Sequence, residues 1–121
     1  MPFALVFHHA HVSVGELDKL RQGLPHAIAG ALSVPGTEAA LEPSEIEVKM
    51  FPFGPFDVSQ GYEVAIVIFA NDYPERRKIV DAAVKRIGQE ARRCLAPNTP
   101  GFVWIRLAPA AFYDFGAREG P

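Results

Sequence analysis

The chain repeats one order of secondary-structure signals twice along its length. In each half, an apolar run typical of a β-strand precedes a helix-capping box, and apolar residues at helical spacing follow the box. The boxes pair Ser13 with Glu16 and Asp72 with Glu75, at equivalent positions of the two halves. A second β run closes each half. The pattern predicts a tandem β-α-β repeat with right-handed, parallel crossovers. The four predicted strands cover residues 3–7, 46–50, 62–69 and 102–107.

Two helices are predicted after the boxes. Pro35 and Gly36 end the first, and the segment 97–101, with two prolines and a glycine, ends the second. Cys94, the only cysteine, cannot form an internal disulfide, and its place on an apolar stripe predicts a buried, unreactive thiol. The first stripe consists of Leu17, Leu20, Leu24, Ala27, Ile28, Ala31 and Leu32, and the second of Ile79, Val80, Ala83, Val84, Ile87, Ala91 and Cys94.

The predicted fold class is α+β, a two-layer arrangement of a four-stranded mixed sheet with two helices on one face. The other sheet face is apolar and has no predicted element to cover it, so we expect it to bury against other copies of the chain. A length of 121 residues predicts a single domain, 1–121. Its pseudo-repeats are expected at about 2–55 and 61–110, with a tail at 111–121. The segment 51–61 holds two prolines and two glycines and is predicted to be a loop.

Charge and hydropathy exclude several classes of function. The net charge is −2, so no basic surface favours nucleic acid or a membrane surface as a partner. No apolar run reaches the length of a membrane span. The N-terminal residues lack the charged and apolar regions of a signal peptide, and we expect a cytoplasmic protein.

The chain begins Met1-Pro2, and a small residue after the initiator usually allows removal of the methionine. Pro2 would then be a free secondary amine at the start of an apolar strand. Low dielectric and nearby cations lower the pKa of such an amine towards neutrality, because both disfavour its charged form. Pro2 is therefore a candidate general base.

With these features the chain resembles the tautomerase superfamily over nearly its whole length. Pro25, the segment 61–65 and the tail 112–116 resemble the carboxymethyl-hydroxymuconate isomerase group, whereas 103–106 and 113–116 also resemble the cis-chloroacrylic acid dehalogenase group. The resemblance implies a homotrimer, catalysis by Pro2 without a cofactor or metal, and a small carboxylate substrate. For the isomerase group it implies a role in aromatic catabolism.

The resemblance also suggests residues that bind the substrate. Lys49 lies on the second predicted strand, where members often carry an arginine that reaches a neighbouring subunit's site. Glu47 is on the same strand face and competes for that position, and a glutamate there would fit dicarboxylate substrates poorly. Arg106 shares a face with Phe102 and Trp104 in an apolar strand, which suits a site or a subunit interface.

The same resemblance suggests six further positions. Asp114 aligns with a tail carboxylate that activates water in the dehalogenase group, and the alternative is an ordinary polar tail residue. Tyr113, Phe115 and Phe56 are candidates for the pocket wall. Arginines near positions 76 and 77 hold the substrate carboxylate in that group, but a solvated helix face is the preferred interpretation of this pair.

The other motifs give less evidence for a particular function. His8, His9 and His11 lack the cysteine or spaced carboxylate that would complete a metal site. No phosphate-binding loop, nucleophile elbow or cofactor motif is present. Three functions remain open: a Pro2-dependent tautomerase or isomerase of an enol or dienol acid; a hydratase, dehalogenase or decarboxylase that uses Asp114; and a non-catalytic oligomeric domain in which Met1 blocks Pro2.

Overall fold

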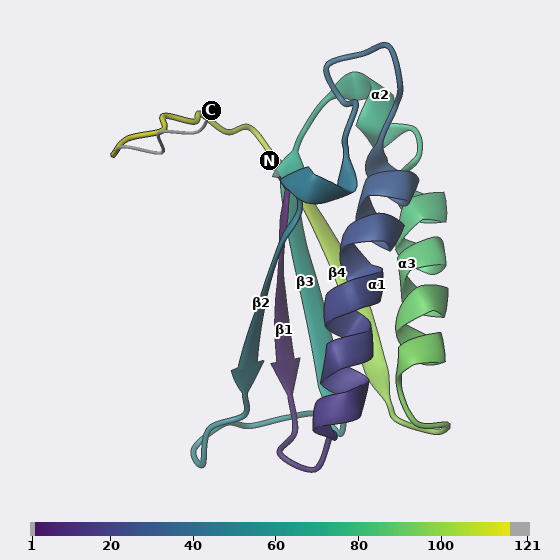
Figure 1. The fold of residues 1–121 in the computed structure, drawn as a ribbon, viewed down its shortest axis with the longest axis vertical. Helices are drawn as coiled ribbons and strands as arrows, with labels where there is room; N and C mark the ends of the chain where they lie inside the picture. Colours follow the sequence, from purple (N-terminus) through teal and green to yellow (C-terminus); the bar gives the residue numbers. More distant parts are fainter. Residues whose placement is uncertain (1, 117–121) are drawn as a thin grey trace.

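Four strands form a single mixed sheet in the order β2-β1-β3-β4 (Figure 1). The structure is a computed structural model that describes residues 2–116. β1 pairs in parallel with β2 and antiparallel with β3, and β3 pairs in parallel with β4. The predicted two-layer, tandem β-α-β fold is confirmed. The elements are β1 (Phe3–His8), α1 (Val14–Leu32), the 3-10 helix η1 (Pro43–Glu45), β2 (Glu47–Pro52), β3 (Val64–Asn71), α2 (Pro74–Arg77), α3 (Val80–Cys94) and β4 (Gly101–Ala108).

The first predicted capping box is present at the start of α1. Ser13 Oγ accepts a hydrogen bond from Glu16 N at 3.1 Å, and Glu16 Oε1 accepts one from Ser13 N at 3.1 Å. Glu16 Oε2 also accepts a hydrogen bond from Ala96 N at 2.8 Å, beyond the end of α3. The box therefore caps one helix and fixes the chain that leaves the other.

The second predicted box is wrong, and the second helix is divided in two. Tyr73, not Asp72, is the N-cap of α2, and its side chain makes no capping hydrogen bond. A residue that precedes proline favours extended backbone, and Tyr73, before Pro74, has φ −101° and ψ 144°. The helix therefore begins at Pro74. The helix is interrupted after Arg77, and Ile79 is the N-cap of α3.

The strand boundaries also differ slightly from the predicted ones. β2 extends to Pro52, two residues beyond the predicted end. Proline has no N–H to donate, and it is tolerated here because β2 is an edge strand. β3 begins at Val64 rather than Tyr62.

The core lies between the sheet and the helices. Alternate residues of β1 and β3 point towards the helices and are buried, as are the stripe residues of α1 and α3. The largest buried apolar side chains are Val6, Leu20, Leu24, Ile28, Leu32, Val64, Ile66, Ile68 and Ile87. No helix within residues 2–116 is both long and apolar enough to cross a membrane.

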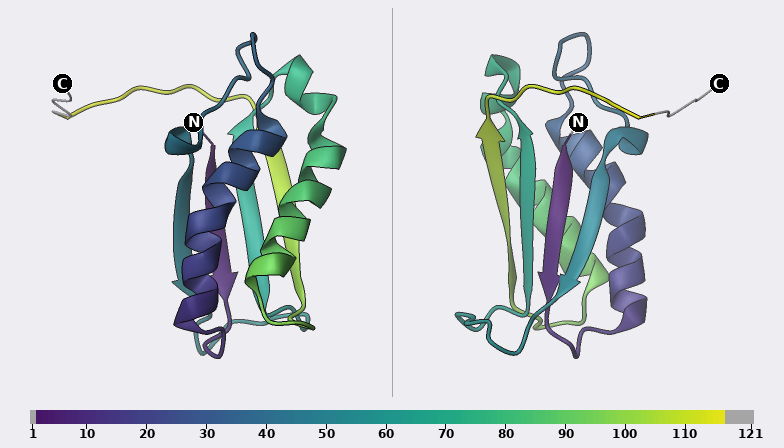
Figure 2. Two further views of the ribbon diagram at one scale, coloured as in Figure 1. Left: turned by 45° about the vertical axis from the view of Figure 1, so that its right-hand side comes forward. Right: turned by 90° about the vertical axis from the view of Figure 1, so that its left-hand side faces the viewer.

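The other sheet face is apolar, and no helix covers it (Figure 2, right). The strand register sets its side chains in three rows, and we call this surface the open face. Trp104, with 53% of its surface exposed, belongs to the middle row. The exposed apolar face predicted from the sequence is thus present in the described chain. The rows are Glu47, Phe3, Phe69 and Arg106; Lys49, Leu5, Val67 and Trp104; and Phe51, Phe7, Ala65 and Phe102.

Candidate active site

Pro2 is buried at the end of the sheet where β1 and β2 begin and β3 and β4 end, which we call the Pro2 end. Its carbonyl oxygen accepts a hydrogen bond from Glu47 N at 3.3 Å, so it is tied to the start of β2. Almost none of its surface is exposed. Pro2 is therefore shielded from solvent by its own chain.

The row of the open face next to Pro2 combines two aromatic rings with two charged groups. Phe3 and Phe69 stack with ring centroids 5.4 Å apart. Glu47 flanks Phe3 on β2, and Arg106 flanks Phe69 on β4. Glu47 and Lys49, the two candidates for the charged position on β2, thus both lie on the open face, and Glu47 is in the row beside Pro2.

Lys49 lies one row further from Pro2. Its Nζ is 3.6 Å from Glu47 Oε2, and both side chains are about half exposed. Arg106 is on β4 with its Cζ 4.9 Å from the centroid of the Trp104 ring. β2 and β4 are the two edge strands, so roughly 14 Å separates them at the usual strand spacing. Lys49 and Arg106 of one chain therefore lie on opposite edge strands, and each contacts a neighbour on its own strand.

The candidate site residues of the tail do not lie at the Pro2 end of the sheet in their own chain. After β4 the chain runs over this end of the sheet and then away from it, past β2 (Figure 1). Phe112, Tyr113 and Phe115 are 73–85% exposed, and Asp114 is exposed as well. The predicted tail continues to residue 121, but 117–121 are outside the described residues. The predicted roles of these side chains stay predictions, and they require a neighbouring copy.

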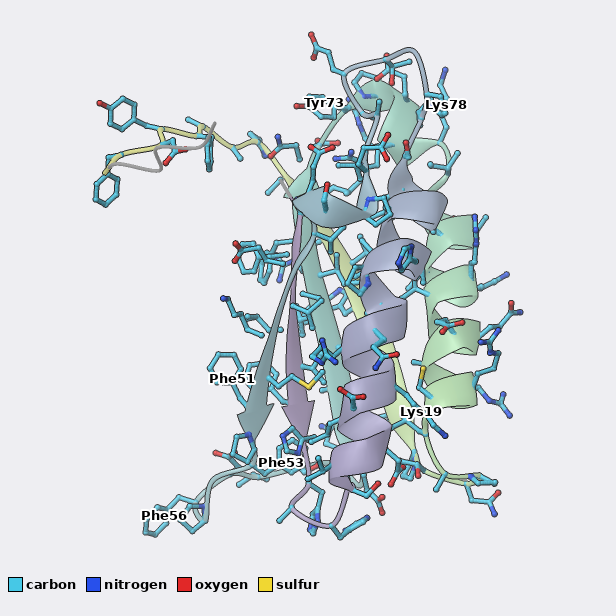
Figure 3. The ribbon with its side chains drawn as sticks, in the orientation of Figure 1. Lys19, Phe51, Phe53, Phe56, Tyr73 and Lys78 are labelled. Atoms are coloured by element: carbon cyan, nitrogen blue, oxygen red, sulfur yellow. The ribbon has the colours of Figure 1, made fainter. Side chains whose placement is uncertain are left out.

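Phe56 is at the other end of the molecule. It is 96% exposed in the loop between β2 and β3, at the opposite end of the sheet from Tyr73 (Figure 3). Within one chain, Phe56 does not reach Pro2. Its predicted role as a pocket wall likewise stays open only for a site formed between copies.

Arg76 is the main residue that the sequence analysis misplaced. Only 2% of its surface is exposed, whereas the preferred interpretation was a solvated helix face. Its guanidinium donates to three backbone carbonyls: Leu32 O at 3.3 Å, Asn71 O at 3.0 Å and Ala39 O at 3.1 Å. Burial lowers the pKa of Arg76. The signal was available, because Arg76 is three, seven and eleven residues before Ile79, Ala83 and Ile87 of the apolar stripe.

Arg77 is exposed, as predicted for this pair. Its Nε lies 2.8 Å from Asp72 Oδ1, which is buried. The Arg77 N–H does not point at this oxygen, so the two atoms form no hydrogen bond. We therefore interpret the contact as an ion pair. Asp72, predicted as a helix cap, thus contacts the side of the helix instead.

His8, His9 and His11 lie at the end of the sheet away from Pro2. His11 Nε2 is 2.7 Å from Glu63 Oε2, and the His9 and His11 rings are 4.2 Å apart. His8 is buried on the helix side of β1. In the part of the chain that the structure describes, no three His, Cys, Asp or Glu side chains are placed to hold a metal ion.

The fold can be compared with known proteins. No protein-family model and no curated protein sequence matches the chain. The structure is similar to that of the fused 4-OT wild-type symmetric trimer, with TM-score 0.62, 15% identity, and 98% of this chain and 94% of that chain covered. It is also similar to 5-carboxymethyl-2-hydroxymuconate delta-isomerase, with TM-score 0.66, 15% identity, and 98% and 89% covered. A further similar structure is Pt0534 inactivated by 2-oxo-3-pentynoate, with TM-score 0.61, 13% identity, and 98% and 93% covered.

These identities are low, so the likeness shows the fold. The chain has the fold of tautomerase-superfamily structures, among them an isomerase. The resemblance stated from the sequence is confirmed at this level.

Proposed function

We propose that this chain, with its tautomerase-superfamily fold, is a cofactor-independent isomerase of enol or dienol carboxylic acids in which Pro2 is the general base. The observation that carries the proposal is the burial of Pro2 at the first residue before β1. The fold likeness to an isomerase supports the class of reaction. The net charge of −2 does not favour nucleic acid as a partner.

The chemistry follows from an uncharged secondary amine at Pro2. The amine takes the proton from the enol hydroxyl of the substrate, and the electron pair moves through the conjugated system to a carbon. The protonated amine then returns a proton to that carbon, so atoms and charge balance over the cycle. The negative charge that develops on the substrate requires a cation or hydrogen-bond donor nearby, and Arg106 and Lys49 are the candidates.

We further propose that the site is shared within a homotrimer. The separation of Lys49 from Arg106 in one chain and the exposure of the tail both support residues from more than one copy. The apolar open face supports association. Three of the similar structures are described as trimers of fused 4-OT. Tyr113, Phe115 and Phe56 would then approach Pro2 from a neighbouring copy.

A second candidate function keeps Pro2 and adds water activation by Asp114, as in a hydratase, dehalogenase or decarboxylase. The exposed carboxylate of the tail is the feature that favours it. The two functions differ in one variant. Asp114→Asn would abolish water addition but leave isomerisation unchanged. If Met1 stays attached, Pro2 is an amide and neither function is possible.

The state of Pro2 is tested first. Intact mass spectrometry of the purified protein reports whether Met1 is removed. The protein is then treated with 2-oxo-3-pentynoate, whose activated alkyne adds an amine without a leaving group. We expect one adduct per chain, located at Pro2 by peptide mapping, and the adduct should be absent from Pro2→Ala. A retained methionine or an adduct elsewhere contradicts the proposal.

Catalysis is tested with a 2-hydroxydienoate and its ketonisation. Pro2→Ala should lower kcat by at least roughly 10²-fold, the size expected when a general base is lost. Pro35→Ala, in an exposed loop, is the matched proline control and should retain the wild-type rate. Equal rates in Pro2→Ala and wild type would end the proline mechanism.

The shared site has its own test. Light scattering should give a trimer, and a stable monomer contradicts it. Subunits with Pro2→Ala and subunits with Arg106→Ala are then mixed after denaturation and refolding. If the two residues meet between copies, mixed trimers regain activity because some sites are wild type. No recovery would mean that both residues act within one chain.

A further inference from the structure

A groove separate from the Pro2 end of the sheet lies between α3 and β4. Its volume is about 390 Å³, and its lining comes from α3, from the helix-facing side of β3, from the first residues of β4 and from the connection between α3 and β4. It lies towards the end of the sheet where β3 and β4 begin, whereas Pro2 lies where they end. The apolar lining residues are Val64, Ile66, Val84, Ala91, Leu95, Phe102 and Val103.

Gly88 keeps this groove open. A Cβ built on Gly88 would have only Val103 Cγ2 within reach, at 4.0 Å, an ordinary contact. By contrast, a Cβ on Gly23 would lie 2.5 Å from Glu90 Oε2, so the Glu90 side chain would have to move. Glycine is unfavourable in the interior of a helix, and close packing does not require it at position 88.

The rim of the groove carries positive charge only. Lys85 and Arg92 line it from the same side of α3, two helical turns or roughly 10 Å apart. No acidic side chain lines it, and neither cation forms an ion pair within residues 2–116. The neighbouring Arg86 and Arg93 are different, since Arg86 donates to a backbone carbonyl and Arg93 lies 3.5 Å from Glu90.

We propose that the α3–β4 groove is a binding site for an amphipathic monocarboxylate, such as a medium-chain fatty acid. The hydrocarbon body lies on the apolar lining and over Gly88, where its burial provides affinity. The carboxylate pairs with Arg92, whose guanidinium can donate two parallel hydrogen bonds. Lys85, roughly 10 Å along α3, does not contact it and contributes only to the positive potential of the rim. Thr99, which also lines the groove, offers a hydroxyl donor. The site does not depend on the chemistry proposed for Pro2.

The test uses decanoate and the full-length protein in its native oligomeric state. Titration followed by two-dimensional NMR should show saturable shifts centred on Gly88, Thr99 and Gly101. Gly88→Leu should abolish these shifts because its side chain fills the groove. Gly88→Ala should retain them, and thermal unfolding of both variants checks that they fold.

Charge recognition is tested by Arg92→Gln, which should weaken decanoate binding by roughly tenfold or more, as expected for a lost charge-assisted hydrogen bond. Lys78→Gln is the matched control, because Lys78 is exposed and does not line the groove. Decanol should bind more weakly than decanoate. The inference is overturned if Gly88→Leu binds like wild type, if decanol binds as well as decanoate, or if the shifts centre on the open face.

Discussion

Arg76 ties together three parts of the fold, and its replacement by methionine tests that role. Its guanidinium donates to carbonyls at the end of α1, in the loop before η1 and at the end of β3. No carboxylate is among these partners, and the Tyr73 ring lies 5.2 Å from Arg76 Cζ. Arg76→Met has similar bulk but removes every one of these donors.

The expected magnitude comes from two opposing effects. Leu32 O would lose its side-chain donor, which costs about 1–3 kcal/mol. Ala39 O and Asn71 O still accept from Val34 N and Tyr73 N, so each hydrogen bond lost there costs about 0.5–1.5 kcal/mol. Removing a buried charge without a carboxylate partner returns part of this cost as desolvation. We therefore expect a net loss of about 1–3 kcal/mol in the free energy of unfolding, out of the roughly 5–15 kcal/mol that is usual for a domain. Arg76→Lys should fall between wild type and Arg76→Met, because one ammonium cannot reach all three carbonyls.

The assay is urea unfolding at one fixed protein concentration, since association also contributes to stability. Lys78→Met is the control, because Lys78 is exposed and lies two residues from Arg76, and its replacement should change stability by less than about 1 kcal/mol. If Arg76→Met is as stable as wild type, the carbonyl hydrogen bonds do not outweigh the cost of burying the charge. The reasoning would then be refuted.

Three further outcomes are expected. The hydrogen bond from Ala96 N lowers the pKa of Glu16, so its stabilising contribution is complete above the ordinary carboxyl pKa of about 4.5 and is lost as the pH falls through the lowered value. Glu16→Gln should remove this part of the acid-unfolding curve, and identical pH profiles would contradict it. Burial raises the pKa of the Cys94 thiol, so a disulfide reagent at pH 8 should label it roughly tenfold or more slowly than free cysteine until urea is added; immediate labelling would count against burial. Gly101→Ala should destabilise by about 1–3 kcal/mol in urea unfolding, because its Cβ would lie 2.9 Å from Val64 O, and an unchanged midpoint would show that β4 can shift.

Much of the fold could be predicted because its signals are local. The Ser13 box and the period of the apolar residues depend on neighbours a few positions away, and the structure confirms both. The second box failed for a local reason as well, since Pro74 forces Tyr73 into extended backbone and moves the cap. The proline therefore outweighs the capping motif at this position.

The candidate site was less predictable because it depends on which strands pair. Glu47 and Lys49 were indistinguishable by alternation, and only the register with β1 places Glu47 in the row beside Pro2. Arg76 has the spacing of an apolar stripe, but a charge in that stripe is buried only where carbonyls converge on it. Those carbonyls come from segments far apart in the chain.

The sequence by itself determined the two β-α-β units, the helix-covered layer and the apolar face opposite, because periodicity and capping act over a few residues. The tertiary structure alone decided the strand order, the burial of Arg76, the separation of Lys49 from Arg106 and the open groove beside Gly88. Each of these depends on packing between segments that are distant in sequence, and a pattern along one segment does not specify which partner it will meet.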